Sequence, residues 1–202
     1  MTGKRQKNRK VIKTMFPGGQ IKNILSHPNM LTLFRVAAVP LIVILLMFPS
    51  RICTFIAALI FTAAAITDFL DGFFARQRGL VSNFGKVMDP VADKVLVSTS
   101  FIMLTSLGWI PAWIVCIIIG REIAVTGLRS IIADNGRDVS ASSLGKYKTG
   151  FQIAAIIPLL IHFQYLTINF HAIGMIFLWA ALILTLWSGA DYFIRSRGLL
   201  KK

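Results

Sequence analysis

The stretch DFLDGFFARQRGLVSNFGKVMDPVAD, residues 68–93, decides the fold, because it sets four of the chain's eight acidic residues between long apolar segments. Of the 202 residues, 55% are hydrophobic, and the mean hydropathy is +0.71. A soluble domain of this size is rarely so apolar, so the composition predicts an integral membrane protein. The length fits one domain of about six helices, at ~20 residues for each membrane crossing.

Six apolar segments flank or include this stretch and predict an all-α bundle of six membrane-spanning helices. Their approximate bounds are Met30–Phe48, Ile52–Phe74, Gly85–Leu107, Trp109–Ala133, Leu144–Tyr165 and Phe170–Arg195. We expect residues 29–202 to form the membrane domain and residues 1–28 to form a basic arm beside the membrane. The apolar residues in the arm favour an interfacial amphipathic helix, and a solvated irregular arm is the alternative.

The charge of the chain is strongly basic, with 22 Lys and Arg against 8 Asp and Glu and a net charge of +14. Such a balance fits a nucleic-acid-binding protein or a membrane protein with cytoplasmic cations, and the placement favours the second. Cations gather in the basic arm, in the second and fourth connections and at the C-terminus, whereas the first connection holds only Arg51 and the third and fifth hold none. We therefore expect both termini and the second and fourth connections to be cytoplasmic, and no nucleic acid partner.

The two cysteines and two of the histidines lie away from the acidic stretch. Cys53 and Cys116 lack the spacing of metal ligands, and we expect both to be small buried apolar side chains. His162 and His171 fall at the opposite end of the predicted spans from the carboxylates. We expect no catalytic role for them.

The four carboxylates form two helical pairs on the same side of the membrane. Asp68 and Asp71 are spaced i, i+3, and Asp89 and Asp93 are spaced i, i+4, so each pair shares one helix face. Ionised groups at membrane depth are costly and usually functional. Singly, Asp89 could be a helix cap before Pro90, and Asp68 could pair with a nearby Arg.

Carboxylates this close repel one another unless a cation lies between them. The cluster has no Cys or His, so its oxygen ligands favour Mg²⁺, Mn²⁺ or Ca²⁺ over Zn²⁺. A carboxylate-held metal pair at a lipid interface indicates phosphate chemistry. Gly72, Ala75 and Gly85 leave the same helix faces open to a flat or bulky group, and close helix packing is the other explanation for these small residues.

These residues follow the pattern D-x2-D-G-x2-A-R-x8-G-x3-D-x3-D, which resembles the signature of the CDP-alcohol phosphatidyltransferase family at every fixed position. The resemblance implies a six-helix membrane bundle with a polar active-site cavity open to the cytoplasm, usually as a homodimer, in a bacterial inner membrane. It implies that Asp68, Asp71 and Asp89 bind two divalent ions, Mg²⁺ or Mn²⁺. Asp93 is implied as the general base and as a further metal contact. The residues implied to bind CDP-diacylglycerol are Asn29, Thr32, Gly72, Ala75, Arg76 and Gly85.

Within the family, the chain is most similar to members whose acceptor is glycerol 3-phosphate. The segments that carry this narrower likeness are Asn29–Arg35, Asp89–Lys94, Arg121–Ile123, Leu128–Arg129, Gly145–Thr149, Gln152 and Leu184–Ser188. The reaction implied is transfer of the phosphatidyl group from CDP-diacylglycerol to that acceptor, with release of CMP.

A phosphate-bearing acceptor needs cations, and we expect these to be Arg121, Arg129, Lys146 and Lys148. The alternative is that they mark topology or contact lipid headgroups. Arg121 interrupts an apolar run, and Glu122 beside it is expected on a different helix face. Arg35 either snorkels to the interface or reaches the cavity.

Three other functions remain open from the sequence. A relative with the same metal site could make cardiolipin, phosphatidylinositol phosphate or phosphatidylserine. A cation transporter would hold the carboxylates near the middle of the membrane, and a non-catalytic scaffold would survive their mutation.

Overall fold

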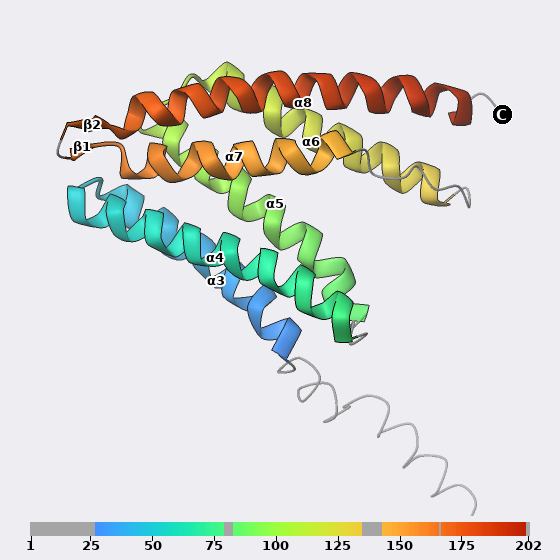
Figure 1. Ribbon diagram of the computed structural model, residues 1–202, viewed down its shortest axis with the longest axis horizontal. Coiled ribbons are helices and arrows are strands. Elements are labelled where there is room, and N and C mark those ends of the chain that lie inside the picture. Colours follow the sequence, from blue (N-terminus) through green and yellow to red (C-terminus); the bar gives the residue numbers. More distant parts are fainter. Residues whose placement is uncertain (1–26, 79–82, 135–142, 166, 201–202) are drawn as a thin grey trace, which may run out of the picture.

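The computed structural model describes residues 27–78, 83–134, 143–165 and 167–200, which form six helices and one short hairpin (Figure 1). The helices are α3 (His27–Met47), α4 (Arg51–Arg78), α5 (Asn83–Ser106), α6 (Ala112–Asp134), α7 (Ser143–Ile161) and α8 (Phe170–Leu200). Strands β1 (Gln164–Tyr165) and β2 (Ile168–Asn169) pair antiparallel between α7 and α8. Residues 1–26, which make up nearly all of the predicted basic arm, lie outside the described ranges.

Each predicted span corresponds to one observed helix, so the all-helical prediction is confirmed. The bounds differ by up to five residues: α8 continues past the predicted end at Arg195 to Leu200, and α7, which was predicted to reach Tyr165, stops at Ile161. His162 has a φ of 53°, a left-handed conformation that ends an α-helix. The following residues then form the hairpin instead of another helical turn.

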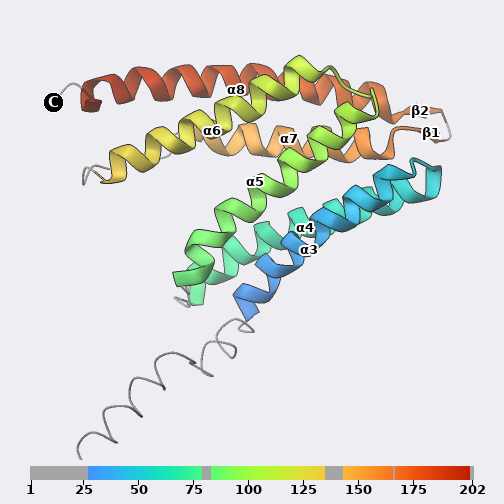
Figure 2. The ribbon, with the colours of Figure 1, turned by 180° about the vertical axis from the view of Figure 1, so that it is seen from behind.

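The helices pack around one apolar core. α7 lies along α8, α3 packs against both α4 and α5, α4 contacts α7, and α6 contacts α8. Figures 1 and 2 show α3 beside α4 and α7 beside α8, with α5 running between these pairs. Fully buried side chains in the core include Phe61, Phe101, Ile114, Leu159 and Leu178.

The elements alternate in direction, so their ends gather at two sides of the molecule. The hairpin lies at one side with the turns that follow α3 and α5, and the free end of α8 lies at the other (Figure 1). The end of α4 and the start of α5, which belong to the acidic stretch, also lie on the second side. This arrangement fits the alternation behind the predicted topology, and the side that faces the cytoplasm stays a prediction.

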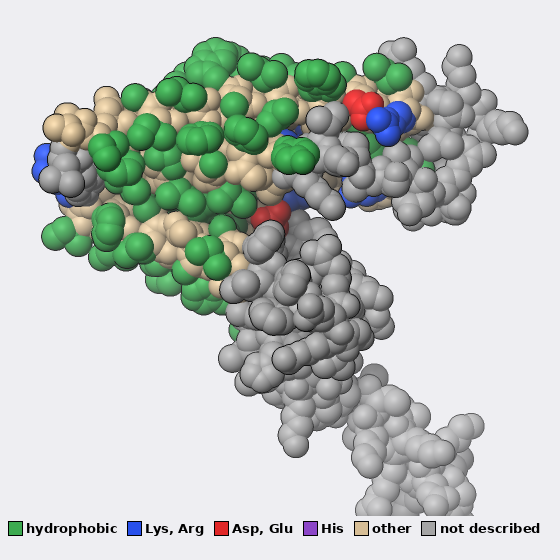
Figure 3. All heavy atoms as spheres, viewed as in Figure 1, with side chains coloured by type: hydrophobic (Ala, Val, Ile, Leu, Met, Phe, Trp, Pro, Cys, Tyr) green, Lys and Arg blue, Asp and Glu red, His purple; other side chains and the backbone are tan. Residues whose placement is uncertain are grey.

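Apolar side chains cover much of the face of the described helices that Figure 3 shows, and many large apolar residues are exposed. Within the described residues, one helix segment, Phe170–Ser196, is both long and apolar enough to cross a membrane, with a mean hydropathy of 2.0 over its best window. Shorter apolar segments are Leu33–Met47, Arg51–Thr67 and Tyr147–Ile161. The structure thus has one clear apolar span, and the count of six stays a prediction.

The expectation that both cysteines are buried is wrong. Cys116 is exposed on α6, and Cys53 is half-buried on α4. Apolar residues of a membrane protein also cover its lipid-facing surface. An apolar sequence context therefore does not distinguish a core position from an outward-facing one.

α7 and α8 pack tightly at Gly174, and this leads to a stability prediction. A Cβ on this residue would lie 2.5 Å from Leu159 Cγ and 3.0 Å from Leu159 N. Because Leu159 is fully buried and its backbone belongs to α7, it cannot move aside freely. We expect Gly174→Ala to destabilise the fold by ~1–3 kcal/mol, measured as a lower Tm of the detergent-solubilised protein.

Gly150→Ala on α7 is the matched control for Gly174→Ala. Among the described residues, nothing lies within 4 Å of a Cβ built on Gly150. The Tm of Gly150→Ala is expected to equal or exceed that of the wild type, because Ala has a higher helix propensity than Gly. Equal Tm values for the two variants would show that α7 and α8 are not closely packed at Gly174.

An aromatic cluster joins the hairpin to the turns at its side of the molecule. The His162 ring stacks on Trp109 with centroids 3.7 Å apart, and its centroid lies 5.0 Å from that of His171. The Arg51 guanidinium lies over the neighbouring Phe163 ring, 5.5 Å from its centroid. Burial of His162, and to a lesser degree the nearby His171, lowers the pKa of His162.

This lowered pKa predicts a loss of stability in mild acid. Below about pH 6.5 the unfolded chain binds a proton at His162 that the folded chain resists, so stability is complete above that pH and falls below it. We expect the Tm drop between about pH 7 and about pH 5 to be smaller in His162→Phe, which keeps an aromatic ring over Trp109 but cannot titrate. An identical drop in both proteins would assign the acid sensitivity to other groups.

Candidate active site

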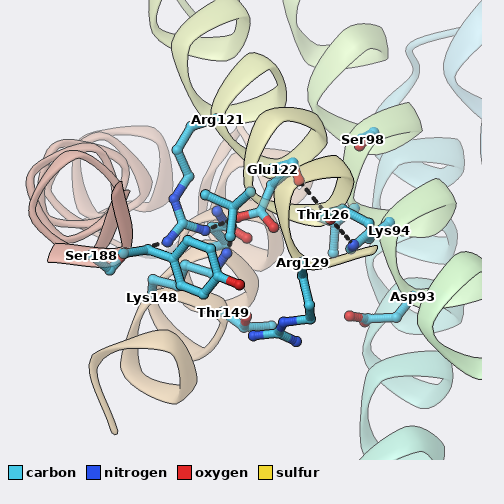
Figure 4. A pocket seen from close by; sticks show the side chains of 14 residues that line it. Asp93, Lys94, Ser98, Arg121, Glu122, Thr126, Arg129, Lys148, Thr149 and Ser188 are labelled. Atoms are coloured by element: carbon cyan, nitrogen blue, oxygen red, sulfur yellow. Dashed lines mark hydrogen bonds and ion pairs between the residues drawn. The ribbon is translucent and has the colours of Figure 1, made fainter. Parts of the chain in front are cut away.

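A polar cavity of about 260 Å³ opens between α5, α6, α7 and α8 (Figure 4). Its charged lining residues are Asp93, Lys94, Arg121, Glu122, Arg129 and Lys148. Its uncharged polar lining residues are Ser98, Thr126, Thr149, Gln152, Ser188 and Tyr192. The site thus combines residues that are far apart in the sequence.

Helical spacing explains why each of the four helices brings polar residues to the same space. On α6, Arg121, Val125 and Arg129 follow one another at intervals of four, and Glu122 and Thr126 repeat the interval one position later. Residues four apart lie one above the other on a helix face. The same interval separates the cavity residues 94 and 98 on α5, 148 and 152 on α7, and 188 and 192 on α8.

The cavity carries an excess of positive charge. Four Lys and Arg side chains line it against two carboxylates, a difference of +2 among the described residues. Because water is partly excluded there, these charges act more strongly than on an open surface. The cavity is therefore suited to an anion such as a phosphate group.

Glu122 is the centre of the charged network. Its Oε1 accepts a hydrogen bond from Arg121 Nη1 at 3.2 Å and another from Lys148 Nζ. The sequence-based expectation that Glu122 lies on a different helix face from Arg121 is wrong, because both residues line the cavity. Both side chains are long enough to reach each other from adjacent helical positions, and both point into the same cavity.

Further contacts hold the cations of the cavity in place. Arg121 Nη2 donates to Ser188 Oγ at 2.8 Å, which joins α6 to α8. The Arg129 guanidinium lies 5.9 Å from the Tyr192 ring centroid, within the range of a cation–π contact. Lys94 Nζ donates to Thr126 Oγ1, which joins α5 to α6. The network is thus built by contacts between helices.

The structure brings together four of the predicted site residues. Asp93, Arg121, Arg129 and Lys148 all line the cavity, and in Figure 4 Asp93 and Arg129 point into it from different helices. Gly72 and Gly85 belong to α4 and α5. The other predicted residues have side chains outside the part that the structure describes: Asp68, Asp71, Asp89, Asn29, Thr32, Ala75, Arg76 and Lys146.

The backbone nevertheless places the acidic pairs near each other. Asp68 and Asp71 belong to the last part of α4, and Asp89 belongs to the first part of α5 with Asp93 one turn later. The two helices are joined through residues 79–82 and contact each other. This puts the backbone of both pairs at the same side of the bundle, and the meeting of the four carboxylates at one point stays a prediction.

The metal prediction is not tested by the described side chains. Among them, no group of three or more His, Cys, Asp and Glu is placed to hold an ion, and Asp93 is the one member of the predicted ligand set that is described. Its carboxylate is a hard oxygen ligand of the kind that Mg²⁺ and Mn²⁺ prefer. What the structure contributes is one suitable donor at the edge of the cavity.

Several cavity residues were not predicted as site residues. Glu122, Gln152 and Ser188 belong to the segments of narrower family likeness, and this was the available signal for them. Tyr192 had no such signal, because its place in the cavity follows from the packing of α8. Arg35 is 1% exposed, so it does not snorkel to the interface, and the alternative that it reaches the active cavity stays a prediction.

Comparison with known proteins places the chain in a family. A model of the CDP-alcohol phosphatidyltransferase family matches residues 25–187. A Bacillus subtilis protein named CDP-diacylglycerol–glycerol-3-phosphate 3-phosphatidyltransferase is 40% identical over 189 residues, covering 86% of this chain and 96% of its own. Proteins of the same name from Rickettsia bellii and Salmonella choleraesuis are 39% and 38% identical, covering 82% and 85% of this chain and 92% and 94% of their own. The chain belongs to the CDP-alcohol phosphatidyltransferase family.

Proposed function

We propose that this protein transfers the phosphatidyl group of CDP-diacylglycerol to glycerol 3-phosphate, which gives phosphatidylglycerophosphate and CMP. The observation that carries the proposal is the cavity in which Asp93 meets Arg121, Arg129 and Lys148. The names of relatives at 38–40% identity support the same donor and acceptor.

The cavity favours a small anionic acceptor. Its volume of about 260 Å³ lies just below the ~300–1,000 Å³ that is typical of small-molecule sites. The excess charge of +2 matches a phosphate dianion better than it matches serine, which has no net charge. Inositol phosphate carries the same group, so the acceptor assay must separate it from glycerol 3-phosphate.

Asp93 is proposed as the general base. Its carboxylate takes the proton from an acceptor hydroxyl, and the acceptor oxygen forms a bond to the lipid-side phosphorus of CDP-diacylglycerol. The bond from that phosphorus to the bridging oxygen breaks, and CMP leaves with the electron pair. Asp93 then gives its proton to water. Arg121, Arg129, Lys146 and Lys148 hold the acceptor's phosphate during this step.

Asp68, Asp71, Asp89 and Asp93 are proposed to hold two divalent ions, Mg²⁺ or Mn²⁺. Bound there, the ions would neutralise the diphosphate and make CMP a better leaving group. The nucleotide end of the donor is proposed to lie along Gly72, Ala75, Arg76 and Gly85, with Asn29 and Thr32 beside it. These roles rest on the match to the family signature.

The proposed setting is a bacterial inner membrane crossed six times, with the active site and both termini in the cytoplasm. The gathering of Lys and Arg in alternate connections supports this topology. A homodimer is proposed from the family likeness alone.

The proposal is tested by CMP release from purified protein in detergent with CDP-diacylglycerol and Mg²⁺. Glycerol 3-phosphate, inositol phosphate, serine and phosphatidylglycerol are offered separately, and EDTA is the metal control. Release with glycerol 3-phosphate alone, abolished by EDTA, is the expected result. Release with another acceptor would keep the family and overturn the proposed substrate. If the folded protein releases no CMP with any of the four acceptors, the proposed function is wrong and a scaffold or a transporter is favoured.

A further inference from the structure

Gly189 on α8 lies directly against the side chain of Arg121 on α6. A Cβ built on Gly189 would lie 3.1 Å from Arg121 Cγ, 3.2 Å from Nε and 3.7 Å from Cδ. The missing side chain therefore leaves a groove on α8, and the stem of Arg121 fills it. Gly189 itself is buried.

Arg121 is fixed on both sides of this groove. Its Cα belongs to α6, and its guanidinium donates from Nη1 to Glu122 Oε1 and from Nη2 to Ser188 Oγ. Between these points, Nε is buried and has no hydrogen-bond partner among the described residues. The position of the stem is thus set by the space over Gly189 and not by a bond at Nε.

We propose that Gly189 is a positioning residue for acceptor binding, because its groove seats Arg121 in the geometry that presents the guanidinium to the acceptor's phosphate. The proposal rests on the proposed function of the cavity. A methyl group at this position would push the stem by a few tenths of an ångström. Since both ends are held, one of the guanidinium hydrogen bonds must lengthen.

The displacement would reach beyond Arg121 itself. Glu122 Oε1 also accepts from Lys148 Nζ, so a shift of the guanidinium disturbs the partner of a second cation in the same cavity. Other glycines near the site lack this relation: Gly120 and Gly127 on α6 have nothing within 4 Å of a built Cβ among the described residues. The effect is therefore specific to the α8 position.

The test is Gly189→Ala, assayed by CMP release at varied glycerol 3-phosphate. We expect the KM for glycerol 3-phosphate to rise about tenfold, the size expected for weakening one hydrogen bond to a charged group. The KM for CDP-diacylglycerol should stay within about twofold. Gly120→Ala, the same change next to Arg121 but in open space, should match the wild type in both constants.

A double-mutant cycle separates positioning from packing. In an Arg121→Lys background the branched guanidinium is absent, so adding Gly189→Ala should change the acceptor KM less than about twofold. Ser188→Ala removes the bond to Nη2 without adding an atom, and it should raise the same KM even if Gly189→Ala folds poorly. If Gly189→Ala lowers kcat and Tm equally in both backgrounds and leaves the acceptor KM unchanged, the glycine serves packing alone and the proposal is wrong.

A binding measurement distinguishes failure of this proposal from failure of the proposed function. Inorganic phosphate should raise the Tm of the wild type, and it should raise it less in Gly189→Ala and Arg121→Lys. If phosphate raises the Tm in this pattern but glycerol 3-phosphate is not a substrate, the positioning role stands and the proposed acceptor is wrong. If phosphate does not stabilise the wild type, Arg121 is not part of an anion site and the positioning role falls.

Discussion

Asp93→Asn is expected to lower kcat by roughly 10²–10⁴-fold, the usual contribution of a general base. Asn keeps the size of the side chain but cannot accept the acceptor's proton. Asp93 lies where α5 meets the cavity that holds the four cations, so the loss should appear at saturating concentrations of both substrates. The measurement is CMP release with saturating Mg²⁺, on protein whose Tm matches the wild type.

A Mg²⁺ titration of the same variant separates the two roles proposed for Asp93. A metal ligand would mainly shift the Mg²⁺ concentration needed for half-maximal rate, whereas a base would lower the rate that saturating Mg²⁺ can reach. Asp191→Asn is the matched control, because Asp191 pairs with Arg195 on α8 and is not among the described cavity residues. If Asp93→Asn kept more than about a tenth of the wild-type kcat, the base would have to be another group.

Lys148→Met is expected to raise the KM for glycerol 3-phosphate by roughly 10- to 100-fold with a much smaller change in kcat. Lys148 is only 8% exposed, lines the cavity and is paired with Glu122. Met preserves most of the stem volume and removes the charge, so binding of an anion is lost while packing is largely kept. The readout is the acceptor KM beside the KM for CDP-diacylglycerol, which should not move.

The control for this variant is Arg195→Met. It removes a cation from the same protein, but Arg195 is exposed and contacts Asp191 outside the described cavity. Its acceptor KM should equal that of the wild type. If Lys148→Met and Arg195→Met behave alike, the cavity cations attract the acceptor only through overall charge and do not bind it directly.

The helices were predictable because each apolar run is long enough to form one, and Gly, Pro or polar residues separate most runs from the next. The end of α7 was not, since the residues Ile161–Tyr165 are mostly apolar or aromatic and give no sign of a break. The turn depends on the positive φ of His162, and that ring is stacked on Trp109 from another part of the chain. Such a contact is tertiary and leaves no local pattern.

The cavity was predictable only in part for a similar reason. Asp93 was predicted from the spacing of the carboxylates, and Arg121 and Lys148 from the need of a phosphate for cations; all three line the cavity. The partners that hold them are ordinary residues such as Ser188 and Gly189, whose position depends on how α8 lies against α6. A glycine matters here through the atoms it lacks, and a sequence read alone does not reveal what occupies that space.

The small size of the cavity has a consequence for how the reaction rate depends on its substrates. A space of about 260 Å³ admits a soluble three-carbon phosphate, while the acyl chains of the donor must stay in the bilayer. The donor therefore comes from the membrane, and the acceptor comes from the bulk solution. The rate should follow the mole fraction of CDP-diacylglycerol in the membrane, so diluting it with inert lipid should slow the enzyme even when the total amount per litre is constant. The acceptor should instead obey its ordinary bulk concentration.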